Sequence, residues 1–484
     1  MATARDPGAD GTIPAESALR QQPLRRSDPT GGDPGNAGLR EVATLIVAEL
    51  QRRGFTSYFA GGCVRDALRG LSPKDIDIAT SATPEQIQGL FRKTVPVGVQ
   101  FGVIRVLEQG YEFELATFRS DGPYFDSRRP ESVTFSSPEQ DARRRDFTIN
   151  GMFYDPVADR VIDYVDGSRD LQRGLIRAIG DPRTRFNEDR LRLLRAVRFA
   201  ATLGFEIEED TWNALRGHAA EILQVSPERI RDELVKILSD RKRLRGLDLL
   251  DTSGLLAAIL PEVANLKGCQ QPFQFHPEGD VFEHTRKMLA LLEPDASIFL
   301  VLSVLLHDIG KPPTQSVDPL DGRIRFNGHD RVGAEMTETV LTRLRFSRAD
   351  IDAVVEAVRQ HMAFKDVKEM RPAKLRRFMA RETFPTELEL HRVDCASSHG
   401  DLENYDFLRR KATEFAAEPI IPPPLLTGND LIGLGMTPGP RFGELLEAVQ
   451  TAQLEGEIKT REEALKVVQE LERKRKSGQR RGEK

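Results

Sequence analysis

Hydrophobic and polar positions follow two different patterns along the chain. In the amino-terminal part, residues 39–53 carry apolar side chains at helical spacing, and residues 84–91 predict a second helix with Thr83 as its cap and Pro84 at its first position. Short apolar runs predict strands at 58–60, 76–79, 103–107, 113–118 and 161–164. This part is therefore predicted to have an α+β fold, built on a small mixed sheet.

Helical spacing dominates from residue 182 onward. The clearest segments are 188–203, 211–223, 227–238 and 247–250. A proline-rich stretch at 421–424 interrupts the helical part near its end. Residues 1–37 are rich in Pro, Gly, Asp and Arg and have no apolar periodicity, so we expect a disordered tail there.

The composition narrows the classes of protein to which the chain can belong. Of its 484 residues, 39% are hydrophobic and 30% are charged, as in soluble globular proteins, and the sequence contains no run of 18 apolar residues that would predict a membrane span. Three widely spaced cysteines argue against a disulfide framework and favour the cytoplasm. The net charge is −5, but arginines cluster at 183–198 and 241–245, where they either attract phosphate groups or form solvated helix faces.

Two aspartates, Asp75 and Asp77, are the first candidate for catalysis. The segment 74–79 reads as a strand in which both carboxylates share one face while Ile76 and Ile78 enter the core. Carboxylates about 7 Å apart on one strand can jointly hold hard divalent cations such as Mg²⁺, as phosphoryl transfer requires. The alternative is a polar strand face that only contacts solvent.

Residues near the aspartates strengthen the catalytic interpretation. Gly61 and Gly62 lie between a predicted strand and a predicted helix, where backbone N–H groups can approach a phosphate, and Arg65 supplies a nearby cation. Glu112 and Glu114 alternate along another predicted strand. If that strand pairs with the aspartate strand, Glu114 completes a trio of carboxylates; otherwise it is an outward-facing charge.

In their order along the chain, these residues and several later motifs resemble the nucleotidyltransferase superfamily. The resemblance is closest to its class II branch, the bacterial CCA-adding enzymes and poly(A) polymerases. The motifs are Gly61-Gly62-x-Val64-Arg65-Asp66 with Asp75-x-Asp77, then 144–150, 163–167, Glu188-Asp189-x-x-Arg192 and 226–230. The resemblance covers about residues 41–238.

The resemblance implies roles for residues that bind the nucleotide. Asp146 would accept a hydrogen bond from a ribose 2′-hydroxyl. The triphosphate would be contacted by Gly62, Arg65, Arg145 and Asn150. The alternative for the basic run 143–145 is an exposed turn.

Base selection is the role that the resemblance implies for Asp189 and Arg192. They lie three residues apart on the predicted helix 188–203, so they share a face, which Arg195 and Arg198 continue. The carboxylate can accept from the amino group of C or A while the guanidinium donates to the ring. The alternative is an ordinary ion pair worth about 0.2–0.5 kcal/mol.

Histidines and aspartates gather in the second half of the chain. Imidazoles and carboxylates that converge from several helices make a divalent-metal site. Their spacing resembles an HD domain, a class that generally hydrolyses phosphoesters with a metal-activated water. The resemblance implies one metal at His284, His307, Asp308 and Asp394, with a second metal or a phosphate at His329 and His361.

We therefore expect a transferase that adds C and A from CTP and ATP to the 3′ end of tRNA, with Mg²⁺ at Asp75 and Asp77 and a second divalent metal at the HD site. Two alternatives stay open: a poly(A) polymerase or an enzyme that adds only A, and an HD phosphohydrolase with an RNA-binding head. The expected divisions are a tail at 1–37, a head at 38–181, a helical neck at 182–270, an HD domain at 271–400 and a helical tRNA-binding tail at 401–484.

Overall fold

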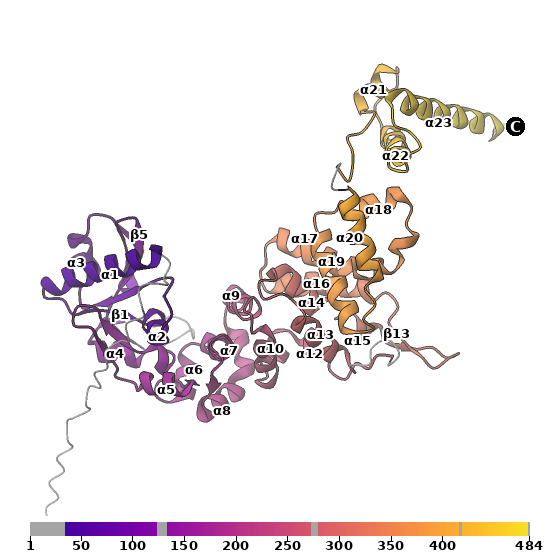
Figure 1. Ribbon diagram of the computed structural model, residues 1–484. Helices are drawn as coiled ribbons and strands as arrows, with labels where there is room; N and C mark the ends of the chain where they lie inside the picture. The colour runs from indigo at the N-terminus through magenta and orange to yellow at the C-terminus, as the bar shows by residue number, and fades with distance from the viewer. Residues whose placement is uncertain (1–33, 123–132, 273–278, 416–418, 483–484) are drawn as a thin grey trace, which may run out of the picture. The chain divides into compact units, whose positions relative to one another are not determined.

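A computed structural model describes residues 34–122, 133–272, 279–415 and 419–482 (Figure 1). Its chain forms two compact units, one comprising the described residues up to Glu233 with Thr252–Ala258, the other Leu234–Asp251 with the residues from Ile259 onward. Most of the expected disordered tail, residues 1–33, lies outside the described residues. The expectation is wrong for residues 34–37, because helix α1 (Pro34–Arg52) begins there.

The first unit contains a seven-stranded mixed sheet in the order β3-β4-β5-β2-β1-β8-β9. The α+β prediction for the head is therefore confirmed. The strands are β1 (Ser57–Ala60), β2 (Asp77–Thr80), β3 (Thr94–Gly98), β4 (Val103–Glu108), β5 (Tyr111–Thr117), β8 (Phe153–Asp155) and β9 (Arg160–Ile162). Helices α1 and α3 (Pro84–Leu90) contribute side chains to the core of this sheet, and Thr83 caps α3 as predicted.

Parallel pairing of β2 with β5 sets the position of the acidic side chains. Ile78 lies opposite Leu115, both fully buried, so the preceding residues Asp77 and Glu114 lie side by side on the other face. The expected strand 74–79 begins later than predicted, at Asp77, because Asp75 lies in an irregular segment before it. Alternation nevertheless persists: Asp75 and Asp77 are exposed while Ile76 is buried.

The helices that follow the sheet in the first unit include α6 (Pro182–Glu188), α7 (Leu191–Leu203), α8 (Glu209–His218) and α9 (Pro227–Leu238), the last of which continues into the second unit. The prediction of one continuous helix over 188–203 is wrong. Asp189 leaves the helical conformation, with φ −145° and ψ 106°, and its carboxylate accepts a hydrogen bond of 3.0 Å from the backbone N–H of Leu191. A side chain that satisfies the first amides of a helix favours a helix start, so the chain breaks at this aspartate.

The second unit is helical. Its main helices are α10 (Arg243–Thr252), α13 (Val281–Ala290), α14 (Ile298–Leu306), α16 (His329–Arg343), α17 (Arg348–Gln360), α18 (Pro372–Met379), α19 (Phe384–Ser397) and α20 (Glu403–Phe415). Three more, α21 (Gly428–Gly433), α22 (Pro440–Leu454) and α23 (Arg461–Gly482), form an apolar cluster of their own near the end of the chain. Among the described residues, no helix combines the length and the apolarity that crossing a membrane requires.

The basic run 241–245 is not a uniform solvated face. Arg243 is only 2% exposed and donates hydrogen bonds to the carbonyl groups of Leu238, Glu293 and Pro294 at 3.1, 3.1 and 2.9 Å. Its guanidinium therefore joins the start of α10 to the loop between α13 and α14, and it is not available to a phosphate.

Candidate functional site

The acidic trio of the head is brought together as the sequence predicts. Asp77 begins β2, Asp75 lies two residues before it, and Glu114 comes from the neighbouring strand β5. Partial desolvation, together with the negative charges of Glu114 and Asp75, raises the pKa of Asp77 to about 6 against the opposing effect of Arg145. Crowded carboxylates of this kind are relieved by a bound cation.

A glycine turn lies beside the carboxylates. Gly61 has φ 76°, a conformation that favours glycine, and helix α2 (Gly62–Leu68) begins directly after it. A Cβ on Gly61 would lie 3.1 Å from Nη1 of Arg145, so the absence of a side chain lets this guanidinium approach the turn. Arg65 donates hydrogen bonds of 2.9 Å to Asn150 and to Asp66, which hold it against the same turn.

Asp146 is held as a buried, ionised acceptor. It is 7% exposed and receives hydrogen bonds from Nε of Arg195 at 2.8 Å and from Nδ2 of Asn150 at 3.1 Å. Burial alone would raise the pKa of Asp146, but the Arg195 guanidinium outweighs it and lowers the pKa to about 2. The carboxylate therefore stays negative at any working pH and suits a hydroxyl donor.

Asp141, which the sequence interpretation missed, organises the basic run. It lies in α4 (Pro138–Arg143), is 1% exposed, and accepts hydrogen bonds from Nη2 of Arg144 at 2.6 Å and of Arg145 at 3.0 Å. Burial opposes ionisation, but the two guanidinium groups hold the pKa of Asp141 below its ordinary value. The i to i+3 and i+4 spacing of Asp141 to the arginines was the available signal. Of the three arginines at 143–145, only Arg143 is exposed.

The pair expected to select the base is present but not paired. Asp189 receives a hydrogen bond of 2.8 Å from Nη2 of Arg229 on α9, and Arg192 donates one of 2.6 Å to Glu188. The i,i+3 ion pair between Asp189 and Arg192 is therefore not formed, and the prediction that one helix carries both is wrong because the chain breaks at Asp189. The sequence interpretation gave no role to Arg229, although it lies in a recognised motif.

Arg198 is also held by α9. Its Nε donates a hydrogen bond of 2.6 Å to Glu233, which is 3% exposed and lies one helical turn after Arg229. The guanidinium groups of Arg65, Arg195 and Arg198 all lie over the ring of Phe199, at 5.3, 5.2 and 4.1 Å from its centre. One aromatic ring thus brings three guanidinium groups together.

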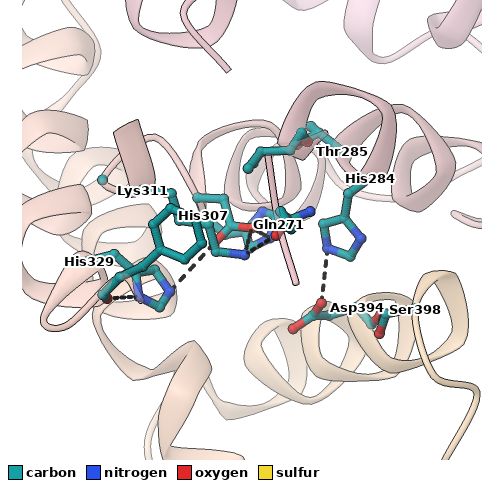
Figure 2. A network of polar contacts seen from close by, with 12 residues as sticks. Gln271, His284, Thr285, His307, Lys311, His329, Asp394 and Ser398 are labelled. Carbon is teal, nitrogen blue, oxygen red and sulfur yellow. Dashed lines mark hydrogen bonds and ion pairs between the residues drawn. The ribbon is translucent and has the colours of Figure 1, made fainter. Parts of the chain in front are cut away.

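The second candidate site lies in the helical unit, where the predicted histidines and aspartates meet (Figure 2). Nε2 of His307 lies 3.0 Å from Oδ2 of Asp308, and Nε2 of His329 lies 3.5 Å from Oδ1 of the same carboxylate. Two ligands of one metal, each about 2.1 Å from it, lie about 3.0–3.4 Å apart. The separations therefore fit ligands that share a cation.

Two groups of potential ligands share Asp308. One comprises His284, His307 and Asp308, and the other comprises Asp308, His329 and His361, all buried. Asp394 joins the first group through a hydrogen bond of 3.0 Å with Nε2 of His284. The structure thus brings together all six residues that the sequence predicts for the HD site.

The protonation of the imidazoles leaves Nε2 available for a metal. Nδ1 of His307, His329 and His361 lies 2.8, 2.8 and 2.6 Å from a backbone carbonyl, which can only accept, so each Nδ1 carries the proton. Burial lowers the pKa of His361 to about 4, and neighbouring His307 lowers it too. Among the described residues, Nε2 of His307 and both carboxylate oxygens of Asp308 are buried and make no hydrogen bond of regular geometry, although Oδ2 forms an ion pair of 2.7 Å with Nζ of Lys311. Such atoms suit metal ligands.

A close crossing of backbones at Gly310 makes this convergence possible. A Cβ at this position would lie 2.1 Å from the carbonyl oxygen of His329 and 2.6 Å from the backbone nitrogen of Gly333. No other residue type fits such an approach, so the glycine allows α16 to bring His329 next to Asp308. Of the unassigned histidines, His391 stacks on Phe364 within an apolar cluster, and His276 lies outside the described residues.

Three segments of the chain match known protein families. Residues 57–177 match the family described as the poly(A) polymerase head domain, residues 204–267 match the probable RNA- and SrmB-binding site of polymerase A, and residues 281–394 match the HD domain.

Two relatives align along most of the chain. The A-adding tRNA nucleotidyltransferase of Deinococcus radiodurans is 36% identical over 427 residues, which cover 84% of this chain and 94% of that enzyme. The CCA-adding enzyme of Latilactobacillus sakei is 32% identical over 429 residues, which cover 87% of this chain and 96% of that enzyme. For the CCA-adding enzyme of Ligilactobacillus salivarius, identity is 46%, but the match covers 43% of this chain and 52% of that enzyme, about half its length.

Solved structures of CCA-adding enzymes also align along most of the chain. The CCA-adding enzyme of Bacillus stearothermophilus in complex with CTP has a TM-score of 0.69 and 28% identity and covers 90% of this chain and 98% of that one. The Thermotoga maritima CCA-adding enzyme complexed with tRNA, with a TM-score of 0.57 and 23% identity over 90% and 95% of the chains, shares the fold.

Proposed function

Because the chain belongs to the family of tRNA nucleotidyltransferases with a poly(A) polymerase head and an HD domain, we propose that it adds C and A from CTP and ATP to the 3′ end of tRNA without a nucleic-acid template. The observation that carries the proposal is the acidic trio beside the Gly61 turn, where desolvation and the neighbouring carboxylates raise the pKa of Asp77 to about 6. A second candidate, addition of A alone, is favoured by the likeness to the Deinococcus radiodurans enzyme.

In the proposed reaction, Asp75, Asp77 and Glu114 hold Mg²⁺, which would lower the pKa of the attacking 3′-hydroxyl and neutralise the triphosphate. Arg65 and Arg145, each fixed by its own acceptor, bind phosphate oxygens with the N–H groups that remain. Backbone N–H groups at Gly62 complete this cradle.

The sugar and the base are read by separate groups. Asp146 accepts from the ribose 2′-hydroxyl while Arg195 and Asn150 keep it ionised and oriented. Asp189 accepts from the amino group of C or A, and Arg192 donates to the ring, each held by a different partner. U and G present a carbonyl where C and A present an amino group, so the Asp189 carboxylate disfavours them. Arg198, fixed to Glu233, adds positive charge beside them.

We propose a metal-dependent phosphohydrolase activity for the HD site. His284, His307, Asp308 and Asp394 would hold one divalent metal, which would supply an activated water, while His329 and His361 would hold a second metal or a phosphate group. The burial of Nε2 of His307 and of both oxygens of Asp308, which make no regular hydrogen bond in the described part of the chain, supports this assignment. The tail of helices α21–α23 is proposed to contact tRNA. The three cysteines are unpaired and support a location in the cytoplasm.

Incubation of the enzyme with one nucleotide at a time tests the transferase. Transcripts of tRNA that lack one, two or three terminal nucleotides should each accept only the next nucleotide of CCA, whereas an A-adding enzyme extends only the transcript ending in CC. Asp75→Ala should abolish incorporation and leave phosphohydrolysis intact, and His307→Ala should do the reverse. Incorporation by Asp75→Ala at the wild-type rate contradicts the proposed site.

A further inference from the structure

A buried lysine lies beside the carboxylate that both candidate metal groups share. Lys311 begins α15 (Lys311–Thr314), is 7% exposed, and places Nζ 2.7 Å from Oδ2 of Asp308. The same ammonium group donates a hydrogen bond of 2.7 Å to Oε1 of Gln271, which is also 7% exposed (Figure 2). Lys311 therefore has two acceptors, and one of them is a proposed metal ligand.

The two oxygens of Asp308 face different neighbours. Oδ2 lies near His307 and Lys311, whereas Oδ1 lies near His329, at 3.5 Å, and His361, at 3.9 Å. An ammonium ion and a divalent cation that approach the same oxygen repel each other and divide its negative charge. Lys311 consequently competes with a metal for Oδ2 of Asp308, on the His307 side, and does not compete for Oδ1, on the His329 side.

Gln271 is suited to receive the ammonium when it leaves Asp308. It is neutral, so it does not attract the metal, and its Oε1 already accepts from Lys311. Its Nε2 is buried and makes no hydrogen bond within the part of the chain that the structure describes. A buried ammonium group without an acceptor would lower the stability of the fold, and Gln271 prevents this because its Oε1 accepts from Nζ of Lys311.

We propose that Lys311 is an internal competitor for a metal at Oδ2 of Asp308, and that Gln271 is the acceptor to which its ammonium group withdraws when a metal binds. This inference rests on the proposed HD metal site and adds two positioning residues to it. Before metal binds, Lys311 keeps the buried carboxylate paired. It thereby protects the fold and weakens the metal position on the His307 side relative to that on the His329 side.

Titration of the metal-free full-length protein with Co²⁺ tests the competition, because the absorption spectrum of Co²⁺ also reports its ligands. Lys311→Met should bind Co²⁺ about tenfold more tightly at the affected position. Lys311→Arg keeps the charge and should bind no more tightly than the wild type. Lys287→Met is the matched control: it removes an exposed lysine of α13 and should leave the affinity unchanged.

A double-mutant cycle tests the role of Gln271. Gln271→Leu removes the second acceptor, so Lys311 stays on Asp308 and Co²⁺ binding should weaken by about threefold to tenfold. In the Lys311→Met background the same change should have no effect, because Gln271 acts only through the ammonium. An equal effect of Gln271→Leu in both backgrounds overturns its assignment as a positioning residue.

Thermal unfolding with and without Co²⁺ separates competition from misfolding. Metal-free Lys311→Met should melt below the wild type, because Asp308 loses its cation, and Co²⁺ should restore the melting temperature. Equal or weaker Co²⁺ binding by Lys311→Met overturns the competition while the metal site stands. If neither the wild type nor Lys311→Met binds Co²⁺, the proposed metal site itself is wrong.

Discussion

Replacing Arg229 by methionine isolates the contribution of a residue that orients the base-selecting carboxylate. Nη2 of Arg229 donates to Oδ2 of Asp189 at 2.8 Å, and the two side chains are only 23% and 18% exposed. Methionine keeps most of the apolar stem, so the packing of α9 is retained while the charge is removed. After the change, the carboxylate of Asp189 keeps the hydrogen bond of 3.0 Å from the backbone N–H of Leu191.

The expected magnitude follows from the lost hydrogen bond. A charge-assisted, largely buried hydrogen bond contributes about 1.5–3 kcal/mol. If Asp189 must be held in this orientation to accept from the amino group of C or A, kcat/KM for CTP and ATP should fall by about 10-fold to 100-fold. A carboxylate that is free to rotate also rejects carbonyl groups less well, so misincorporation of UTP should rise relative to CTP.

Steady-state incorporation of single nucleotides is the appropriate assay, with CTP and UTP on tRNA that lacks CCA and with ATP on tRNA ending in CC. Arg231→Met is the matched control, because Arg231 lies on the same helix and pairs with the exposed Asp232. The reasoning is refuted if Arg229→Met retains the kcat/KM and the CTP-to-UTP ratio of Arg231→Met. A uniform loss for every nucleotide, together with a lower melting temperature, would show that Arg229 only stabilises the fold.

Three further outcomes are expected. Gly310→Ala should abolish Co²⁺ binding and lower the melting temperature, because a Cβ 2.1 Å from the carbonyl oxygen of His329 forces α16 away; equilibrium dialysis and calorimetry check this. At limiting Mg²⁺, incorporation should fall as the pH drops through about 6, because Asp77 becomes protonated, and more Mg²⁺ should move the midpoint of the pH–rate profile to lower pH. Arg243→Ala should cost about 2–4 kcal/mol in urea unfolding, because it removes hydrogen bonds to three carbonyl groups and leaves that of the buried Leu238 without this donor, whereas Lys287→Ala should cost less than about 0.5 kcal/mol.

The sequence predicted those features that depend on near neighbours. Alternation in 113–118 and capping by Thr83 are local, so β5 and α3 appear where they were expected. Strand β3 was missed, because Pro96 interrupts its apolar pattern and the strand lies at the edge of the sheet, where a missing N–H is tolerated. The break at Asp189 was missed because hydrophobic spacing continues through it, while the cap that causes it is made by one side chain.

The partners of the functional residues could not be predicted, because they come from distant segments. Arg229 lies 40 residues after Asp189, and Glu233 lies 35 residues after Arg198. Spacing rules describe pairs within one helix or one strand, so they proposed Asp189 with Arg192, a pair that the fold does not form. The motifs showed which groups are chemically able to act, and the tertiary structure decides which groups hold them.

The contrast between two aspartates of the head distinguishes a cation site from a hydrogen-bond acceptor. Asp146 has a dedicated guanidinium partner, and its pKa is lowered to about 2, so its charge is already balanced by the protein. Desolvation and the carboxylates of Glu114 and Asp75 raise the pKa of Asp77 to about 6 and outweigh the effect of Arg145, so the protein does not fully balance its charge. A fold pays for such crowding only where an external cation balances it, and this asymmetry is the physical reason to place magnesium at Asp77 and the ribose hydroxyl at Asp146.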